Sequence, residues 1–194
     1  GHASHSEGRG TTALGDYSHA EGYNTTTEAL YAHAEGENTT ASVQAAHAEG
    51  INTNALGLYG HAEGWNTTSG PAMAAHAEGE DTMAQGQAAH AEGLATFANG
   101  PYSHAEGNGS VAAGEASHAS GVGTVINTVG GTSMGTYNET MDDVLLVVGD
   151  GVGSANRSDA FSVDLSGITR AHNKLYIDTI NQQNIMRLSF ASTN

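Results

Sequence analysis

The chain has 194 residues, of which 27 are glycine, 6% are aromatic and none is cysteine. So few bulky apolar side chains cannot fill the core of an ordinary globular domain, and the lack of cysteine excludes disulfide frameworks and thiolate zinc sites. The 21 acidic and five basic residues give a net charge of −16, and no run of about 18 apolar residues occurs, so neither nucleic acid nor a membrane is an expected partner.

Residues 1–124 carry a short histidine-containing word that recurs every 14 residues. The first copy is SHSEG, the next seven are SHAEG, AHAEG or GHAEG, and the ninth is SHASG. One interval, from His61 to His76, has 15 residues and contains Gly70-Pro71, a turn-forming pair that can absorb the extra residue. Self-similarity at a fixed period indicates a repeat architecture.

Each repeat contains two short segments in which small residues occupy alternate positions. Ser18, Ala20 and Gly22 mark one such segment, and Thr39 with Ala41 marks the other. A period of two is typical of β-strands, and the Gly, Asn and Asp residues between the segments favour turns. Two strands and two turns in one repeat predict a coil of a parallel β-solenoid, with coils stacked about 4.8 Å apart.

A coil this narrow has room only for small side chains between its two strands. We therefore expect Ser, Ala, Gly and Thr inside, and a column of His beside a column of Glu outside. Because a single chain buries so little apolar surface, we expect association to cover one outer face. The predicted ladder residues are His5, Glu7, His19, Glu21, His33, Glu35, His47, Glu49, His61, Glu63, His76, Glu78, His90, Glu92, His104, Glu106 and His118.

The character of the sequence changes after Gly121, where the repeated word stops. Ser120 already replaces Glu in the last copy, as is typical of a terminal repeat. Apolar patterning predicts strands at 144–148 and 161–165, with further candidates at 175–177 and 185–190. Residues 125–194 are therefore expected to form a small β-rich module beside the rod of residues 1–124, which holds 14 of the 21 acidic residues.

These repeats resemble the head domain of YadA-like trimeric adhesins, and the SHAEG form is similar to that of many phage tail-fibre and prophage proteins. The resemblance covers about residues 1–124 and rests on nine copies in register. It implies an all-β fold, namely a left-handed parallel β-roll of 14-residue coils in an intertwined homotrimer, and a role in attachment. The stretch 147–164 also resembles a segment that often follows such repeats in phage tail proteins.

The chain departs from the adhesin pattern at the two variable positions of each word. These positions are typically Val and Ile in the adhesins, packed at the centre of the trimer, and here they are His and Glu. If the packing carries over, the trimer core is polar and each of its groups needs a partner. Charged His–Glu pairs would raise the pKa of His, lower that of Glu, and place maximum stability at mildly acidic pH.

A metal site is the alternative interpretation of the His-x-Glu pattern, because imidazole and carboxylate together bind divalent cations. A uniform ladder of His–Glu pairs is preferred, since metal sites are few per chain and need supporting groups around them. The sequence therefore predicts no metal and no cofactor. It also predicts no enzymatic activity, because it has no cysteine, no G-x-S-x-G word and no carboxylate pair that stands apart from the repeats.

Several aromatic residues at variable outer positions are candidates for receptor contact, because exposed aromatic rings stack on sugars and anchor protein partners. The alternative is that they cover the coil edges or pack between chains. These residues are Tyr17, Tyr31, Tyr59, Trp65, Phe97 and Tyr102.

The resemblance implies a rigid trimeric shaft or head of a phage tail fibre or prophage-derived tail protein. Such a protein would lie in the virion, contact other tail proteins, and bind a host cell-surface polysaccharide or protein receptor at several points at once. The alternative is the head of a bacterial trimeric autotransporter adhesin, at the bacterial cell surface, that binds host matrix. A third interpretation is a metal-binding structural protein.

Overall fold

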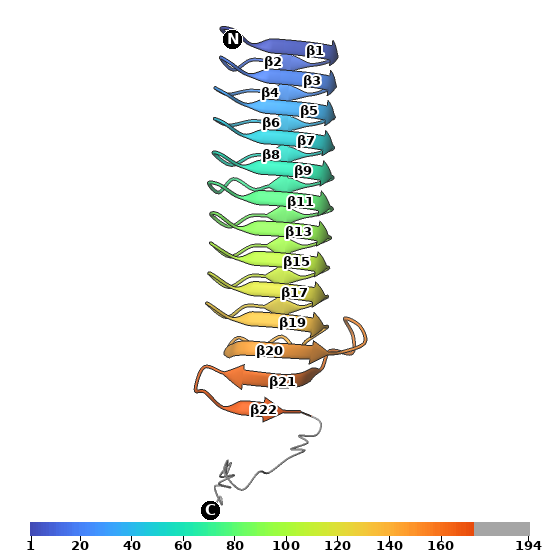
Figure 1. Ribbon diagram of the computed structural model, residues 1–194, viewed down its shortest axis with the longest axis vertical. Helices are drawn as coiled ribbons and strands as arrows, with labels where there is room; N and C mark the ends of the chain where they lie inside the picture. The colour runs from blue at the N-terminus through green and yellow to red at the C-terminus, as the bar shows by residue number, and fades with distance from the viewer. Residues whose placement is uncertain (173–194) are drawn as a thin grey trace, which may run out of the picture.

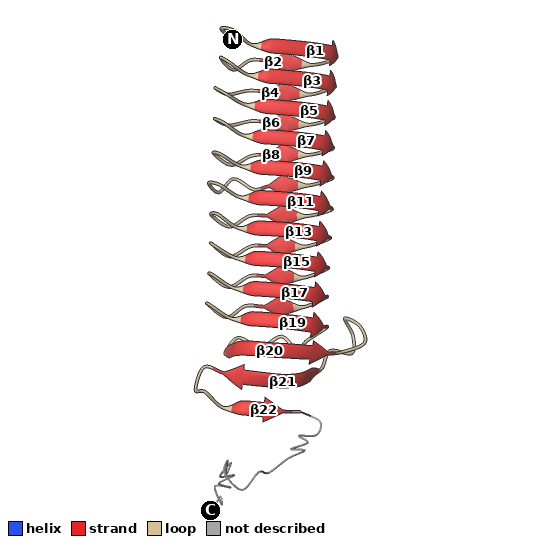
Figure 2. Cartoon of the chain, in the orientation of Figure 1, coloured by secondary structure: helices blue, strands red, loops and turns tan. Residues whose placement is uncertain are grey.

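The computed structural model describes residues 1–172, which form a β-solenoid that contains no helix (Figures 1 and 2). In the rod, each coil contributes a strand of five residues and a strand of two residues. The long strands stack into one sheet and the short strands into a second. The predicted all-β solenoid of 14-residue coils is confirmed. Within this part of the chain, no segment has the helical form and length needed to span a membrane.

The strands of the rod alternate between the two sheets. The long strands are β1 (His5–Arg9), β3 (His19–Tyr23), β5 (His33–Glu37), β7 (His47–Ile51), β9 (His61–Trp65), β11 (His76–Glu80), β13 (His90–Leu94), β15 (His104–Asn108), β17 (His118–Val122) and β19 (Thr132–Thr136). The short strands are β2 (Thr12–Ala13), β4 (Thr26–Thr27), β6 (Thr40–Ala41), β8 (Asn54–Ala55), β10 (Thr68–Ser69), β12 (Met83–Ala84), β14 (Phe97–Ala98), β16 (Val111–Ala112) and β18 (Val125–Ile126).

Equivalent residues of successive coils lie directly above one another. In the long sheet, for example, β3 and β5 pair in parallel with each His, Glu and Gly opposite its own counterpart. The 15-residue interval does not disturb this register, because His61 still pairs with His76. The additional residue lies in the turn between Ser69 and His76, after which the short strands are again aligned.

The glycine that ends each repeated word allows successive coils to stack closely, because it has no side chain. Gly64 has a φ of +114°, a conformation that favours glycine. A Cβ at this position would also overlap the carbonyl oxygen of Gly79 in the next coil. Backbone conformation and coil spacing therefore both require glycine here.

The interior of the rod is filled by small side chains, as the sequence predicts. Ala34 of a long strand and Thr39 of the turn that follows it are both completely buried. Larger buried side chains occur near the C-terminal end of the described chain, where Ile126, Val144 and Val147 are packed together with the last alanines of the rod. The core thus changes from small residues to branched apolar ones along the molecule.

The stack of coils continues beyond residue 124. β19 pairs in parallel with β17, and β20 (Val144–Asp150) pairs in parallel with β19, so Thr132 lies on His118 and Leu146 on Thr132. β20, β21 (Asp159–Asp164) and β22 (Thr169–Ala171) then form an antiparallel meander.

The strands predicted at 144–148 and 161–165 are confirmed by β20 and β21. The candidates at 175–177 and 185–190 lie outside the described residues. The division of the chain into residues 1–124 and 125–194 stays a prediction. One continuous sheet crosses that boundary.

Two polar side chains join the rod to the meander. The Asn138 amide accepts a hydrogen bond from the Val125 N–H and donates one to the Val125 carbonyl, both at 2.8 Å. Arg157 donates to the carbonyls of Gly123 at 2.8 Å and Asn138 at 3.0 Å, and its guanidinium lies over the Tyr137 ring. The Asn138 side chain therefore takes the hydrogen bonds that a further strand would make with the edge of β18.

Candidate functional site

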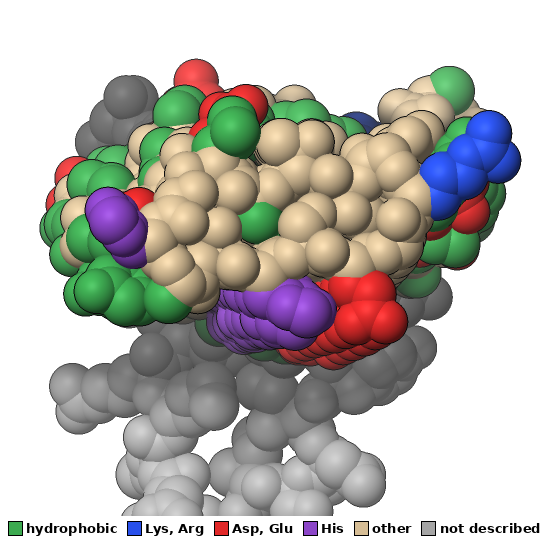
Figure 3. Space-filling model, turned by 90° about the horizontal axis from the view of Figure 1, so that it is seen from above, with side chains coloured by type: hydrophobic (Ala, Val, Ile, Leu, Met, Phe, Trp, Pro, Cys, Tyr) green, Lys and Arg blue, Asp and Glu red, His purple; other side chains and the backbone are tan. Residues whose placement is uncertain are grey.

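One face of the long sheet carries a column of histidines beside a column of glutamates, which we call the His/Glu face (Figure 3). The second and fourth residues of each repeated word, His and Glu, point outward, because from the second copy on the alanine between them points into the coil. From His19 to Glu92 the His side chains are 35–39% exposed and the Glu side chains 43–53% exposed. The structure therefore places the predicted ladder residues on one outer face.

The imidazole rings of this face stack along the rod at the spacing of the coils. Ring centroids are 4.7 Å apart between His47 and His61 and again between His61 and His76, with interplanar angles of 10° and 9°. In the first seven words, from His5 to His90, the His Nε2 also approaches the Glu Oε2 of its own word. That distance is 3.6 Å for His61 and Glu63 and 3.9 Å for His76 and Glu78.

The Nε2 atoms along most of the column are buried and lack a hydrogen-bond partner. The contacts with Glu are too long or too poorly directed to serve as hydrogen bonds. A buried polar atom without a hydrogen-bond partner costs free energy. These nitrogens would therefore be stabilised by a hydrogen-bond donor, an acceptor or a metal ion that contacts them. The residues concerned are His19, His33, His47, His61, His76, His90 and His104.

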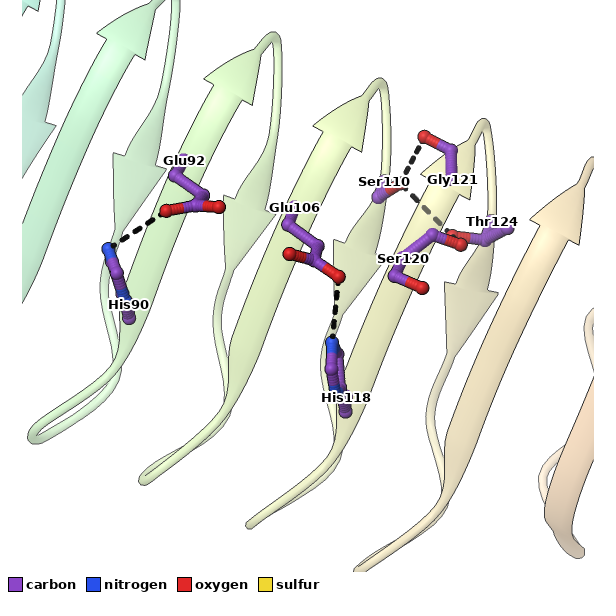
Figure 4. Close-up of polar contacts among 8 residues, drawn as sticks. All are labelled: His90, Glu92, Glu106, Ser110, His118, Ser120, Gly121 and Thr124. Atoms are coloured by element: carbon purple, nitrogen blue, oxygen red, sulfur yellow. Dashed lines mark hydrogen bonds and ion pairs between the residues drawn. The ribbon is translucent and has the colours of Figure 1, made fainter.

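The pairing changes at the last repeat, where Ser120 takes the place of Glu (Figure 4). His118 has no acid on its own strand and instead contacts Glu106 of the preceding coil, with Nε2 and Oε1 3.4 Å apart. Within residues 1–172, His104 consequently has no carboxylate oxygen within 4.0 Å of its ring nitrogens. The ladder is therefore not uniform along its length.

Burial lowers the pKa of three histidines of this column. Desolvation lowers the pKa of His47, His61 and His90, and neighbouring histidines lower it further, whereas the nearby Glu carboxylates raise it. In the single chain the histidine pKa is therefore lowered at these three residues, and the rise expected for charged pairs in a trimer core stays a prediction. The physical reason for the lowering is that carboxylates 3.6–3.8 Å away do not compensate for the loss of water around the rings.

Comparison with known proteins identifies the rod. Residues 6–26, 77–103 and 105–125 match the family described as "YadA head domain repeat (2 copies)". The rod is a YadA-like head domain. This match confirms the resemblance seen in the sequence and gives the chain a structural, adhesin-like role rather than that of an enzyme family. No curated protein matches the chain.

The six aromatic candidates lie in three separate places on the YadA-like head. Tyr17, Tyr31, Tyr59 and Tyr102 occupy the turn before a long strand, each with a positive φ and more than half exposed. Tyr17 and Tyr31 stack with ring centroids 5.5 Å apart. Trp65 is equally exposed at the far end of strand β9, whereas Phe97 is partly buried on β14. Their role in receptor contact stays a prediction.

The sequence analysis missed one regular feature of the YadA-like head. The last residue of each long strand forms a third column, which we call the edge column. Several of its members are apolar and 37–52% exposed, and the 14-residue spacing could have revealed them. They are Tyr23, Ile51, Trp65, Leu94 and Val122.

Proposed function

We propose that three copies of this chain associate with their His/Glu faces at the centre of a homotrimer. The observation that carries this proposal is the row of seven buried Nε2 atoms without hydrogen-bond partners. These atoms are covered within the single chain, so each ring would turn outward to take a partner from a neighbouring chain, and the association would cover both columns over the length of the rod. The match to YadA head repeats supports three as the number of copies.

The trimer would act as a stiff shaft or head in host attachment. We place it in a phage tail fibre or a prophage-derived tail protein, where it would adjoin other tail proteins and bind a polysaccharide or protein on the host surface. The stacked tyrosines and the edge column support this role, because they repeat exposed aromatic and apolar groups along the rod. Three such surfaces turn weak contacts into firm attachment.

A pair of charge reversals on one strand tests the trimer. Glu35 lies on the His/Glu face and Glu37 in the edge column of the same strand β5. We expect Glu35→Lys to place a cation against the histidines of the core and to reduce the trimer to monomers in light scattering. Glu37→Lys, with the same change of charge, should remain trimeric. Equal behaviour of both variants, or a monomeric wild type, would reject the proposal.

A bacterial trimeric adhesin that binds host matrix is the second candidate, and the adhesin family match favours it. Gold-labelled antibodies against the rod should decorate phage tails if the first candidate is right, and the bacterial surface if the second is right. A glycan array and host-cell binding assay would then identify the receptor. Loss of binding in Tyr17→Ser/Tyr31→Ser, with Phe97→Ser as the control, would place it on the tyrosine turns.

A further inference from the structure

We propose that His90, Glu92 and His104 form a binding site for a divalent transition-metal ion such as Zn²⁺ or Co²⁺. Two imidazoles and one carboxylate are donors that these ions accept in proteins, with the remaining positions left for water or another ligand. All three residues belong to the adjacent strands β13 and β15 of one chain. The site therefore needs no residue of a second chain, although His90 and His104 also lie on the face that the proposed trimer would cover.

The spacing of the donor atoms suits an ion better than a hydrogen bond. In a tetrahedral site, Zn–N and Zn–O bonds of about 2.0–2.2 Å place two ligand atoms about 3.4 Å apart. The Nε2 of His90 and the Oε2 of Glu92 are 3.8 Å apart, which is beyond hydrogen-bond range and within about 0.4 Å of that spacing. The ligand atoms of all three residues lie within 4.8 Å of one another, so the His104 ring must turn toward the His90–Glu92 pair for one ion to contact all three.

His104 is available because the ladder shifts at its end. Ser120 leaves His118 without an acid on its own strand, and Glu106 turns toward His118 (Figure 4). His104 is thereby the one ladder histidine in residues 1–172 without a carboxylate oxygen within 4.0 Å, and its Nε2, buried like those of the six histidines before it, lies beside the His90–Glu92 pair. The sequence favoured a uniform ladder of His–Glu pairs over a metal site. The ladder is not uniform at His104, so that argument does not apply there.

A second group of donors shares one ligand with this site. His76, Glu78 and His90 also have ligand atoms within 4.8 Å of one another. Their histidines are each paired with the Glu of their own word, at 3.9 Å and 3.8 Å. The group that includes the unpaired His104 is therefore the stronger of the two.

Titration of the full chain with Co²⁺ after chelator treatment tests the site, because bound Co²⁺ has a visible spectrum that reports its ligands. We expect one ion per chain. His104→Gln should weaken binding roughly tenfold or more, since it removes a direct ligand. His33→Gln is the matched control from the same column, where His33 has its own Glu partner, and it should bind as the wild type does. Circular dichroism melts confirm that each variant folds.

The variant Ser120→Glu distinguishes a specific site from general affinity of a histidine-rich surface. It gives His118 an acid on its own strand, which frees Glu106 to pair with His104 as in the earlier coils. We expect Co²⁺ binding to weaken although a carboxylate is added. Unchanged or tighter binding in Ser120→Glu, equal loss in His33→Gln and His104→Gln, or no Co²⁺ binding by the wild type would each overturn the proposal.

Discussion

The rod and the C-terminal meander are stabilised in different ways although they share one sheet. In the rod, every coil repeats the same contacts between small side chains and between parallel backbones. In the meander, individual side chains make individual contacts. The Asp164 carboxylate, for example, accepts hydrogen bonds from Ser166, Ile168 and Arg170, which lower its pKa to about 2. The rod therefore depends on repetition of close packing, and the meander on particular side chains.

The largest expected effect comes from adding one carbon atom to the middle of the rod. Gly64→Ala places a Cβ against the Gly79 carbonyl in a backbone conformation that disfavours alanine, and should cost about 3 kcal/mol or more. Thermal and urea unfolding measure this loss. Gly153→Ala in the meander is the control, because its Cβ would have no neighbour within 4 Å. Similar losses in both variants would contradict the contrast between the regions.

The interior of the rod should be sensitive to a larger side chain, and the core near the meander to a smaller one. Ala62 is completely buried between the strands of the rod, and Ala62→Leu should destabilise by about 1–3 kcal/mol because no space exists for the larger side chain. Val147 is 1% exposed near the meander, and Val147→Ala should cost about 2 kcal/mol by leaving a cavity. The same unfolding measurements apply. A rod that accepts leucine without loss would show that its interior is not closely packed.

Removal of the Arg157 guanidinium should destabilise the meander without destabilising the rod. Arg157→Met keeps most of the side-chain volume but loses the bonds to the carbonyls of Gly123 and Asn138, at an expected cost of about 1.5–3 kcal/mol. Hydrogen exchange should then increase in β20 and β21 while the centre of the rod stays protected. Arg9→Met, at an exposed position on β1, is the control and should leave both regions unchanged.

The smallest effect per residue is the pH dependence of the histidine column. The folded pKa of His47 lies below its ordinary value of 6.5, so the unfolded chain binds more protons as the pH falls. The free energy of unfolding of a single chain should therefore decrease as the pH falls through about 6.5, the pKa of the unfolded residue, and be independent of this residue well above that pH. Melts in the presence of a chelator measure the slope, which His47→Gln should reduce. Maximum stability at acidic pH would instead indicate charged His–Glu pairs.

The regular part of the fold could be predicted from the sequence because every copy of the word repeats the same physical constraint. Alternation at Ser18, Ala20 and Gly22 fixes which side chains enter the coil, and the 14-residue period fixes the register. The continuation of the stack to β20 could not be predicted in this way. Its residues pair at the same spacing through backbone groups, and their side chains no longer repeat the word.

The candidate site was predictable in its composition and not in its local detail. The sequence gives no sign of whether Glu106 pairs with the histidine of its own coil or of the next, since both are sterically accessible from one sheet face. Nor does it show that burial outweighs carboxylate attraction at His47, His61 and His90, because that balance depends on solvent exposure. The pairing of Asn138 with the edge of β18 likewise depends on a contact across 13 residues.

The 15-residue coil has a consequence for how such a rod can change. Its additional residue lies between Ser69 and His76, and the strands on both sides keep their alignment. The length of this turn is therefore uncoupled from the alignment of the columns, and a longer loop can project there without altering its neighbours. A repeat protein built in this way can acquire a new surface by insertion at a turn, while the stack that supports it stays the same.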